Sequence, residues 1–263
     1  MPAAPNRMVV SFQDVTKTFE RPDGSGPFTA VDSLSFEVAR GEIVAVLGKT
    51  GCGKSTIFNL IAGLAEPTSG RIAVEGENPF GDFSKLRGKI GIVFQGDRLM
   101  PWRTAIDNVL LGFEILGLDR ARARAIAQEW LARLGLAGHE NDYPHALSGG
   151  MRQRVSIARA LAVDPMLILC DEPFSALDEM TAGRLRAEFL RLVRDSAKTA
   201  LFITHSIEEA MEVGDRIMVL HRPARIALEA KLGAPLSLDR KAELRNQILQ
   251  ILAGEGEPVS ISG

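Results

Sequence analysis

The sequence predicts an α/β fold with a mostly parallel sheet, and three observations support this class. Residues 43–47, "IVAVL", are uniformly apolar, as expected of a central strand that is covered on both faces. From residue 166 onward, strand-like stretches alternate with helical ones, which indicates parallel strands joined by helices. Residues 104–163 have helical patterning, so we expect a helical segment inserted between the strands of the sheet.

The opening third of the chain is predicted to form mainly β-strands. Four stretches are short, rich in β-branched or aromatic residues and separated by turn residues: 8–19, 30–38, 41–48 and 69–76. Directly after Gly53, apolar residues recur at helical spacing, and this spacing predicts a helix over 54–64.

The rest of the chain divides into further helices and strands. Helical patterns occupy 104–118, 119–136, 181–197 and 206–214. Strand patterns occupy 166–173, 199–205 and 215–221. After Pro223 we expect one more helix over 239–254, because apolar residues form a stripe along one of its faces.

Composition and charge bound the possible functions. The chain has 263 residues, 46% of them hydrophobic, and a net charge of −2, so its overall field does not attract nucleic acid or an anionic membrane. Its two cysteines do not make a disulfide framework, which favours a reduced compartment. We expect no secretory signal, and no stretch approaches the ~18 apolar residues of a spanning helix. If the protein works at a membrane, another chain holds it there.

The nine residues "GKTGCGKST" at 48–56 match the phosphate-binding pattern G-x-x-x-x-G-K-[ST]. They follow a buried strand and precede a helix, as that pattern requires. Glycines let backbone N–H groups turn inward around an anion, and the following helix adds its unpaired donors. Lys54 is expected to reach the β- and γ-phosphates, and the Ser55 hydroxyl to bind Mg²⁺. The alternative is a glycine-rich turn without a ligand. Lys49 has no role that the pattern fixes, and an exposed lysine is the simpler interpretation.

An acidic pair, Asp171 and Glu172, ends the apolar strand "LILCDEP". A carboxylate at the end of such a strand suits a Mg²⁺ site beside a phosphate loop. The next residue faces differently and could orient or deprotonate an attacking water. An acidic pair that ends a strand by itself is more often a turn, so the functional interpretation depends on residues 48–56.

The stretch "LSGGMRQR" at 147–154 resembles the signature motif of ABC-type ATPases, and the order of the other motifs matches that family along almost the entire chain. Gln95 in "IVFQ" resembles the Q-loop, and "SALD" at 175–178 resembles the D-loop. His205 in "FITH" resembles the switch histidine. Phe19 in "TKTF" lies where the family places an aromatic residue that stacks on adenine.

This resemblance implies a P-loop NTPase (RecA-like) core, an N-terminal antiparallel β subdomain and an inserted α-helical subdomain in one ABC ATPase domain, 1–263. The nucleotide-binding core would comprise 1–95 and 164–222. The helical signature subdomain would be 96–163, and 223–263 a C-terminal helical tail.

The resemblance also assigns roles to single residues. The expected catalytic residues are Glu172 as base, His205 at the γ-phosphate and Gln95 near Mg²⁺ or the attacking water. Mg²⁺ would be held by Ser55, Gln95 and Asp171. The expected ATP-binding residues are Phe19, Gly48, Lys49, Thr50, Gly51, Cys52, Gly53, Lys54, Ser55, Thr56, Ser148, Gly149, Gly150, Gln153 and Asp178.

The segment 148–150 begins a helix with a hydroxyl N-cap at Ser148, and such a helix start is another place where an anion can bind. In the absence of the resemblance we would interpret it as a loop and a cap. The resemblance implies a head-to-tail dimer, most simply of identical subunits, in which Ser148, Gly149 and Gly150 of one subunit close the ATP site of the other.

The stretches "VFQGDRLMPWRTAIDNV" and "YPHALSGGMRQRVSIARALAVDPMLILCDEPFSALD" resemble ATPase subunits of bacterial nitrate, sulfonate and taurine importers. The implied partners are transmembrane permease subunits and, indirectly, a periplasmic solute-binding protein, with no nucleic acid. The implied location is the cytoplasmic face of the inner membrane, and the implied solute is small and anionic. Trp102 is either a partner contact or a core residue. A lipid-trafficking or other non-importer ABC complex is the alternative.

Three positions depart from the family's usual residues. Phe19 replaces a tyrosine and keeps the stacking face, and Cys170 replaces a methionine. Ser206 follows the histidine where aspartate is typical, and this change puts the orientation of His205 in doubt. With the catalytic positions otherwise filled, we expect a competent ATPase.

Overall fold

The computed structural model describes residues 8–232, 237–254 and 259–260. The chain forms two compact units: unit 1 comprises Met1–Leu86 and Thr199–Gly263, and unit 2 comprises Arg87–Lys198. These limits differ from the core and insertion limits expected from the sequence, because unit 2 includes two strands and a further helix beside the helical segment. Each unit is described by itself.

Unit 1 contains a three-stranded antiparallel sheet, as expected for the N-terminal β subdomain. Its strand order is β2-β1-β4, made of β1 (Met8–Glu20), β2 (Pro27–Ala39) and β4 (Ser69–Val74). Phe12 of β1 lies opposite Phe36 of β2, and their rings stack with centroids 4.5 Å apart. Burial of this pair ties the two longest strands together.

The second sheet of unit 1 has the order β10-β9-β8-β3-β7. Its strands are β3 (Ile43–Gly48), β7 (Thr199–Thr204), β8 (Arg216–His221), β9 (Arg225–Lys231) and β10 (Val259–Ser260). β3 runs parallel to both β7 and β8, and all six of its residues are buried. The prediction of a central strand with two covered faces is therefore confirmed.

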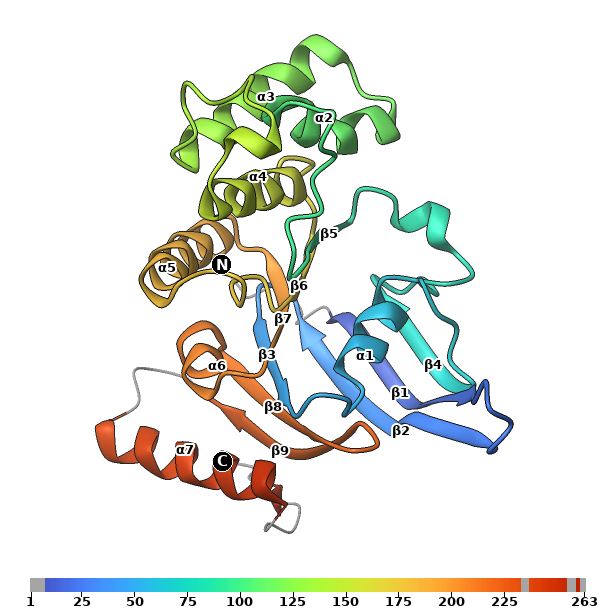
Figure 1. Cartoon of the computed structure of the whole chain (residues 1–263). Helices are drawn as coiled ribbons and strands as arrows, with labels where there is room; N and C mark the ends of the chain where they lie inside the picture. The colour runs from blue at the N-terminus through green and yellow to red at the C-terminus, as the bar shows by residue number, and fades with distance from the viewer. Residues whose placement is uncertain (1–7, 233–236, 255–258, 261–263) are drawn as a thin grey trace, which may run out of the picture. The chain divides into compact units, whose positions relative to one another are not determined.

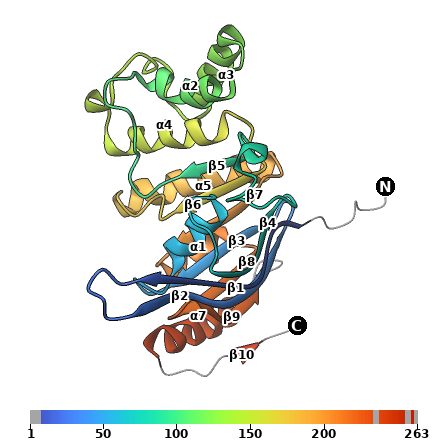
Figure 2. The ribbon, with the colours of Figure 1, turned by 90° about the vertical axis from the view of Figure 1, so that its right-hand side faces the viewer.

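The helices of unit 1 are α1 (Lys54–Ile61), α6 (Ile207–Val213) and α7 (Leu238–Ala253), with a 3₁₀ turn at Phe83–Leu86. α7 packs on β8 and β9 (Figure 2). Leu244, Ile248 and Ile251 of its predicted apolar stripe are buried. The helix predicted after Pro223 is confirmed, but β9 precedes it and is antiparallel to β8. The sequence prediction missed that strand.

Unit 2 contains a parallel pair of strands and four helices, all of them labelled in Figure 1. The strands are β5 (Ile90–Val93) and β6 (Leu167–Asp171). The helices are α2 (Ala105–Leu116), α3 (Arg120–Arg133), α4 (Gly149–Leu161) and α5 (Glu179–Asp195), with a 3₁₀ turn at Pro144–Ala146. α2, α3 and α4 pack against one another, and α4 also packs on β5 and α5. The predicted helical insertion is therefore present.

Across the part of the chain that the structure describes, a helix that is both long and apolar enough to cross a bilayer does not occur.

Candidate nucleotide-binding site

The loop between β3 and α1 packs closely against neighbouring backbone at Gly53. This glycine has a φ of 109°, outside the range that other residues readily adopt. A Cβ at this position would lie 2.4 Å from the Ala30 carbonyl oxygen and 2.7 Å from the Ala224 Cβ. The loop therefore rests directly on β2 and on the turn between β8 and β9, and only glycine fits.

The side chain of Lys54 is folded back over this loop. It is 7% exposed, and its ammonium donates hydrogen bonds to the Gly48 oxygen at 2.6 Å and the Lys49 oxygen at 3.1 Å. The loop thus places a cation beside the first-turn N–H groups of α1, and Gly53 has no side chain to cap those donors. Cation, backbone donors and helix dipole favour the same ligand, an anion.

The other residues of the loop divide into a buried and an exposed group. Cys52 is buried, and this burial raises the pKa of its thiol. Its Sγ lies 2.5 Å from where a Cβ of Gly48 would stand, so Cys52 fills the inside of the loop. Lys49, Thr50, Gly51 and Ser55 are exposed, and Thr56 is half-buried. The simpler expectation for Lys49 agrees with this exposure.

His205 leaves the sheet at the same edge as the loop. It follows β7 directly, and the last residue of β7, Thr204, is paired with Leu47 of β3. Ser206 begins α6, where its hydroxyl accepts from the Glu209 N–H at 3.2 Å. The serine in place of the family's aspartate therefore caps the helix that follows the histidine.

Phe19 lies near the end of β1, opposite Phe28 of β2, and is 42% exposed. Together with Phe28, Arg21 and Arg222 it lines a hollow of about 460 Å³. The Arg222 guanidinium lies over the Phe28 ring at 5.3 Å. This arginine belongs to the turn whose Ala224 contacts Gly53, so the hollow lies close to the phosphate loop. An exposed aromatic face in a hollow suits a flat ring such as a nucleobase.

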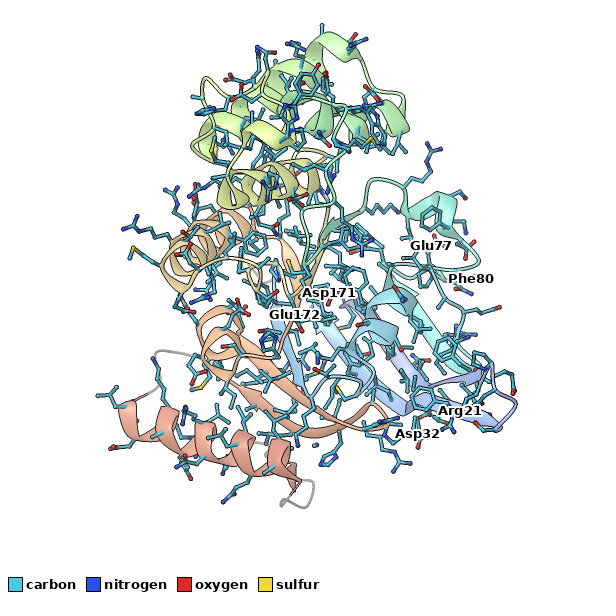
Figure 3. All side chains as sticks on the ribbon, viewed as in Figure 1. Arg21, Asp32, Glu77, Phe80, Asp171 and Glu172 are labelled. Carbon is cyan, nitrogen blue, oxygen red and sulfur yellow. The ribbon has the colours of Figure 1, made fainter. Side chains whose placement is uncertain are left out.

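In unit 2, Gln95 and the acidic pair follow two neighbouring parallel strands. Val93 of β5 is paired with Cys170 of β6, so Gln95 and Asp171 lie at the same edge of this pair. Figure 3 shows Asp171 and Glu172 where β6 ends. Glu172 has a φ of 46°, a left-handed value that is uncommon for a residue other than glycine. Strain of this kind is concentrated at functional sites, where the surrounding structure maintains it.

The start of α4 is an exposed helix tip. The Ser148 hydroxyl accepts from the Met151 N–H at 3.3 Å, and both Ser148 and Gly149 are exposed. A Cβ at Gly150 would lie 3.0 Å from the Thr181 side chain of α5. The small residues therefore let α4 approach α5 while leaving its first turn open.

Asp178 caps α5 beside this tip. Its carboxylate accepts from the Thr181 N–H at 3.0 Å, and hydrogen bonds from Thr181 lower its pKa below the ordinary 3.8. The structure thus brings the predicted signature residues and Asp178 to neighbouring helix starts in unit 2.

Gln153, which the sequence-based interpretation places among the ATP-binding residues, is buried in unit 2. Its side chain is 4% exposed, and its amide nitrogen donates to the Pro173 oxygen at 2.6 Å and to the Phe94 oxygen at 3.3 Å. This amide nitrogen is used inside unit 2, where it joins α4 to two loops. The position of Gln153 on one helical face with Ile157 and Ala160 is the sequence signal of its burial.

Sequence reasoning also missed Asn108, a fully buried polar residue of α2. Its side chain accepts from the Met100 N–H at 2.8 Å and donates to the oxygens of Met100, Arg103 and Thr104. These bonds fix the loop that carries Trp102, whose side chain is 73% exposed. The core interpretation of Trp102 is therefore wrong.

The predicted residues fall into two groups. Unit 1 holds Phe19, His205 and the whole segment 48–56, while unit 2 holds Gln95, the segment 148–150, Gln153, Asp171, Glu172 and Asp178. This fold and these residues define a P-loop nucleotide hydrolase. Residues 31–175 match the ABC transporter family model, and the chain belongs to that family. It is an ATP hydrolase of the ABC transporter type.

The chain is similar to import ATP-binding proteins for taurine, aliphatic sulfonates and nitrate. The chain is 44% identical over 191 residues to the taurine import ATP-binding protein TauB of Yersinia pestis, covering 73% of each. It is 41% identical over 252 residues to the aliphatic sulfonates import ATP-binding protein SsuB of Burkholderia ambifaria, covering 93% of this chain and 72% of the relative. The nitrate import ATP-binding protein NrtC of Synechococcus elongatus is 40% identical over 228 residues, which cover 86% of this chain and 33% of the relative.

Solved structures give the same assignment. The dimeric ABC transporter cassette MJ0796 matches with a TM-score of 0.76 at 35% identity, covering 85% of this chain and 98% of that one. A dimeric post-hydrolysis state of the same cassette, bound to ADP and Pi, matches with a TM-score of 0.75 at 34% identity and the same coverage. The expected fold class is therefore confirmed.

Proposed function

We propose that this chain is the ATP-hydrolysing subunit of a bacterial importer for a small anionic solute. We propose further that two copies enclose ATP between the phosphate loop of one and the 148–150 segment of the other. The observation that carries the dimer proposal is the exposed, glycine-lined start of α4, which leaves anion-directed donors at the molecular surface. The relatives that import taurine, sulfonates and nitrate support the choice of solute.

Binding begins with the loop 48–56. Its N–H groups and Lys54 would hold the β- and γ-phosphates, while adenine stacks on Phe19. Lys54 must then exchange its bonds to the Gly48 and Lys49 oxygens for bonds to phosphate. Because the cation already lies at the loop, little rearrangement is needed.

The residues assigned to Mg²⁺ fit that ion by their chemistry. Ser55, Gln95 and Asp171 offer hydroxyl, amide and carboxylate oxygens, which hard cations prefer. Within the described residues there is no cluster of three or more His, Cys, Asp or Glu that could hold a metal. Such a sparse donor set suits an ion that is bound mainly through nucleotide phosphates and water. When bound, Mg²⁺ would neutralise charge that develops on the phosphates.

For hydrolysis, Glu172 would accept a proton from the attacking water, whose oxygen then bonds to the γ-phosphorus as the bond to the β-phosphate oxygen breaks. His205 would contact the γ-phosphate, and Gln95 would orient the water or Mg²⁺. The strained backbone of Glu172 supports this role, since strain of this kind is concentrated at functional sites.

Dimer closure on ATP and opening after hydrolysis would drive a separate permease. The exposed Trp102, on a loop fixed by Asn108, supports a contact with that partner. The protein would then be peripheral at the cytoplasmic face of the membrane, and a periplasmic binding protein would deliver the solute.

The test uses Glu172→Gln beside the unmodified chain. We expect the variant to bind ATP with unchanged affinity, to hydrolyse at least about 100-fold more slowly, and to remain a dimer in ATP. Turnover is measured by phosphate release and mass by light scattering. Hydrolysis at the unmodified rate would exclude Glu172 as the base, and a variant that stays monomeric in ATP would contradict the dimer.

A further inference from the structure

Helix α4 carries side chains that reach both loops assigned to hydrolysis. The Gln153 amide nitrogen donates to the oxygens of Phe94 and Pro173, at 3.3 and 2.6 Å. Phe94 immediately precedes Gln95, and Pro173 immediately follows Glu172. One buried amide thus joins the backbone beside the predicted water-orienting residue to the backbone beside the predicted base.

A second set of bonds holds the Q-loop on its other side. Arg152 donates from Nε to the Asp97 carboxylate and from a guanidinium nitrogen to the Leu147 oxygen, each at 2.8 Å. Arg159 donates to the backbone oxygens of Asp97 and Arg98, each also at 2.8 Å. Hydrogen bonds from α4 therefore hold the segment 94–98 on both sides of Gln95, at Phe94 and at residues 97–98.

The same helix begins with Ser148, Gly149 and Gly150, which face solvent or the start of α5. An α-helix of this length moves as a stiff body because each backbone N–H bonds the carbonyl four residues earlier. A displacement at its tip is then carried to Arg152 and Gln153 within one to two turns.

Building on the proposed function, we propose that Gln153 is a positioning residue that couples the tip of α4 to Gln95 and Glu172. Gln153 does not touch the nucleotide. Its amide holds the carbonyls of Phe94 and Pro173, which are next to Gln95 and Glu172 in the chain. A shift of the helix tip, when it meets the γ-phosphate bound by the other copy, is thereby transmitted to the side chains of Gln95 and Glu172. Arg152 and Asp97 form a weaker second link to the Q-loop.

The chemistry of the amide makes the proposal testable. A glutamate at 153 has almost the same shape but presents a carboxylate oxygen to two carbonyl oxygens, which repels both. A methionine at 153 keeps the volume and removes the donor, leaving two buried acceptors without their bonds. Both changes release the loops and leave the phosphate loop 48–56 and the segment 148–150 unaltered.

The experiment compares Gln153→Glu and Gln153→Met with Glu188→Gln. The Glu188 carboxylate pairs with Arg154, the next residue of α4, at 2.5 Å, so the control weakens the same helix without touching either loop. Steady-state ATP hydrolysis gives kcat and KM, a fluorescent ATP analogue gives affinity, and thermal unfolding gives stability. The purified full-length chain is used at a concentration where the unmodified protein is active.

We expect kcat of both Gln153 variants to fall by about 100-fold, the effect of a misplacement of about 1 Å at a catalytic group. KM and analogue affinity should change by less than about threefold, while Glu188→Gln should retain kcat within about twofold despite a similar loss of stability. Should the Gln153 variants fail to fold, Asp97→Asn tests the second link, because both partners of that pair are partly exposed. Its kcat should fall by about fivefold with KM unchanged.

Two results overturn the inference while leaving the proposed function intact: unchanged kcat in the variants, or a loss that Glu188→Gln shares in proportion to stability. Absence of ATP hydrolysis by the unmodified chain, alone and with its permease, is a different outcome that overturns the proposed function and the inference with it.

Discussion

The two helix starts that the sequence assigns to ATP, those of α1 and α4, are built in opposite ways. The N-cap of α1 is Gly53, where a Cβ would lie 2.4 Å from the Ala30 carbonyl oxygen and 2.7 Å from the Ala224 Cβ. α4 begins at Ser148, and a Cβ at Gly149 would meet nothing nearer than 3.8 Å. The first helix start is therefore packed tightly against its neighbours at Gly53, whereas the second is an exposed tip.

Their hydrogen bonds differ in the same way. The first turn of α1 has no side-chain cap, and the Lys54 ammonium lies across the loop, where it donates to the backbone oxygens of Gly48 and Lys49. The Ser148 hydroxyl already caps α4, and its neighbour Asp178 caps α5. The start of α1 therefore has uncapped N–H groups beside a cation, whereas the start of α4 has a hydroxyl cap. This difference supports the proposal that α1 binds ATP first and α4 closes over the ATP of another copy.

The largest expected contrast comes from adding a methyl group to each helix start. Gly53→Ala introduces backbone strain of about 1–3 kcal/mol and crowding of about 1–3 kcal/mol, so the free energy of unfolding should fall by several kcal/mol with loss of ATP binding. Gly149→Ala should change the free energy of unfolding by no more than about 0.5 kcal/mol. Urea unfolding measures this free energy for each variant, and titration with ATP measures the affinity for ATP. Equal destabilisation by the two variants would contradict the comparison.

Charge changes at the two starts should separate binding from turnover. Lys54→Ala removes the buried cation and should weaken ATP binding by about 10- to 100-fold, corresponding to one charge-assisted hydrogen bond. Ser148→Arg should keep the monomer's affinity for ATP and stop turnover, since the larger side chain blocks the tip. Isothermal titration and phosphate release distinguish these outcomes, and weakened monomer binding by Ser148→Arg would speak against an exposed tip.

Removing the cap of α4 should have a smaller effect. Ser148→Ala deletes the hydroxyl that accepts from the Met151 N–H and should lower the free energy of unfolding by about 1 kcal/mol. Thermal unfolding at several urea concentrations measures it. The matched control is Ser237→Ala, which removes the hydroxyl cap of α7 and should cost a similar amount without altering turnover. If both variants lost the same fraction of their ATP turnover, the result would contradict a specific role of the α4 start in hydrolysis.

The smallest expected effect concerns how the free energy of unfolding depends on pH. The cap of α5, Asp178, should contribute to this dependence, whereas the cap of α4, Ser148, should not. The pKa of Asp178 lies below 3.8 in the folded protein because Thr181 donates to its carboxylate. A lowered folded-state pKa stabilises the protein above the ordinary value, and this contribution is lost as pH falls through the folded-state value. Asp178→Asn should therefore flatten the acid end of the stability profile slightly, whereas Ser148→Ala should shift the profile evenly. Unfolding curves between pH 2 and 6 test this.

The sequence predicted the elements whose signal is local. β3 and the loop 48–56 combine a uniformly apolar strand with a glycine pattern, and both are present in the structure. β9 was missed because "RIALEAK" contains alanine, glutamate and lysine, which favour strands weakly, and its place is set by pairing with β8. The exposure of Trp102 and the bonds of Asn108 depend on how one loop folds back on α2, which spacing alone does not specify.

The site shows the same division. The sequence could point to the motif residues because their chemistry is tied to a pattern, and the structure places those of each unit at strand ends and helix starts. The pattern grouped Gln153 with the residues that bind ATP, whereas its amide bonds Phe94 and Pro173. Such bonds join residues 59 and 20 positions apart, so they follow from the packing of α4 and not from local sequence.

Mixing two inactive variants tests the central claim most directly. Lys54→Ala damages only the phosphate loop, and Ser148→Arg damages only the tip of α4, so each homodimer has a lesion in both sites. If the sites are shared between copies, a mixed dimer regains one intact site. Random pairing of equal amounts makes about half of the dimers mixed, so the mixture should hydrolyse ATP at up to about a quarter of the unmodified rate per total protein. A mixture as inactive as its components, with mixed dimers shown to form, would contradict the account.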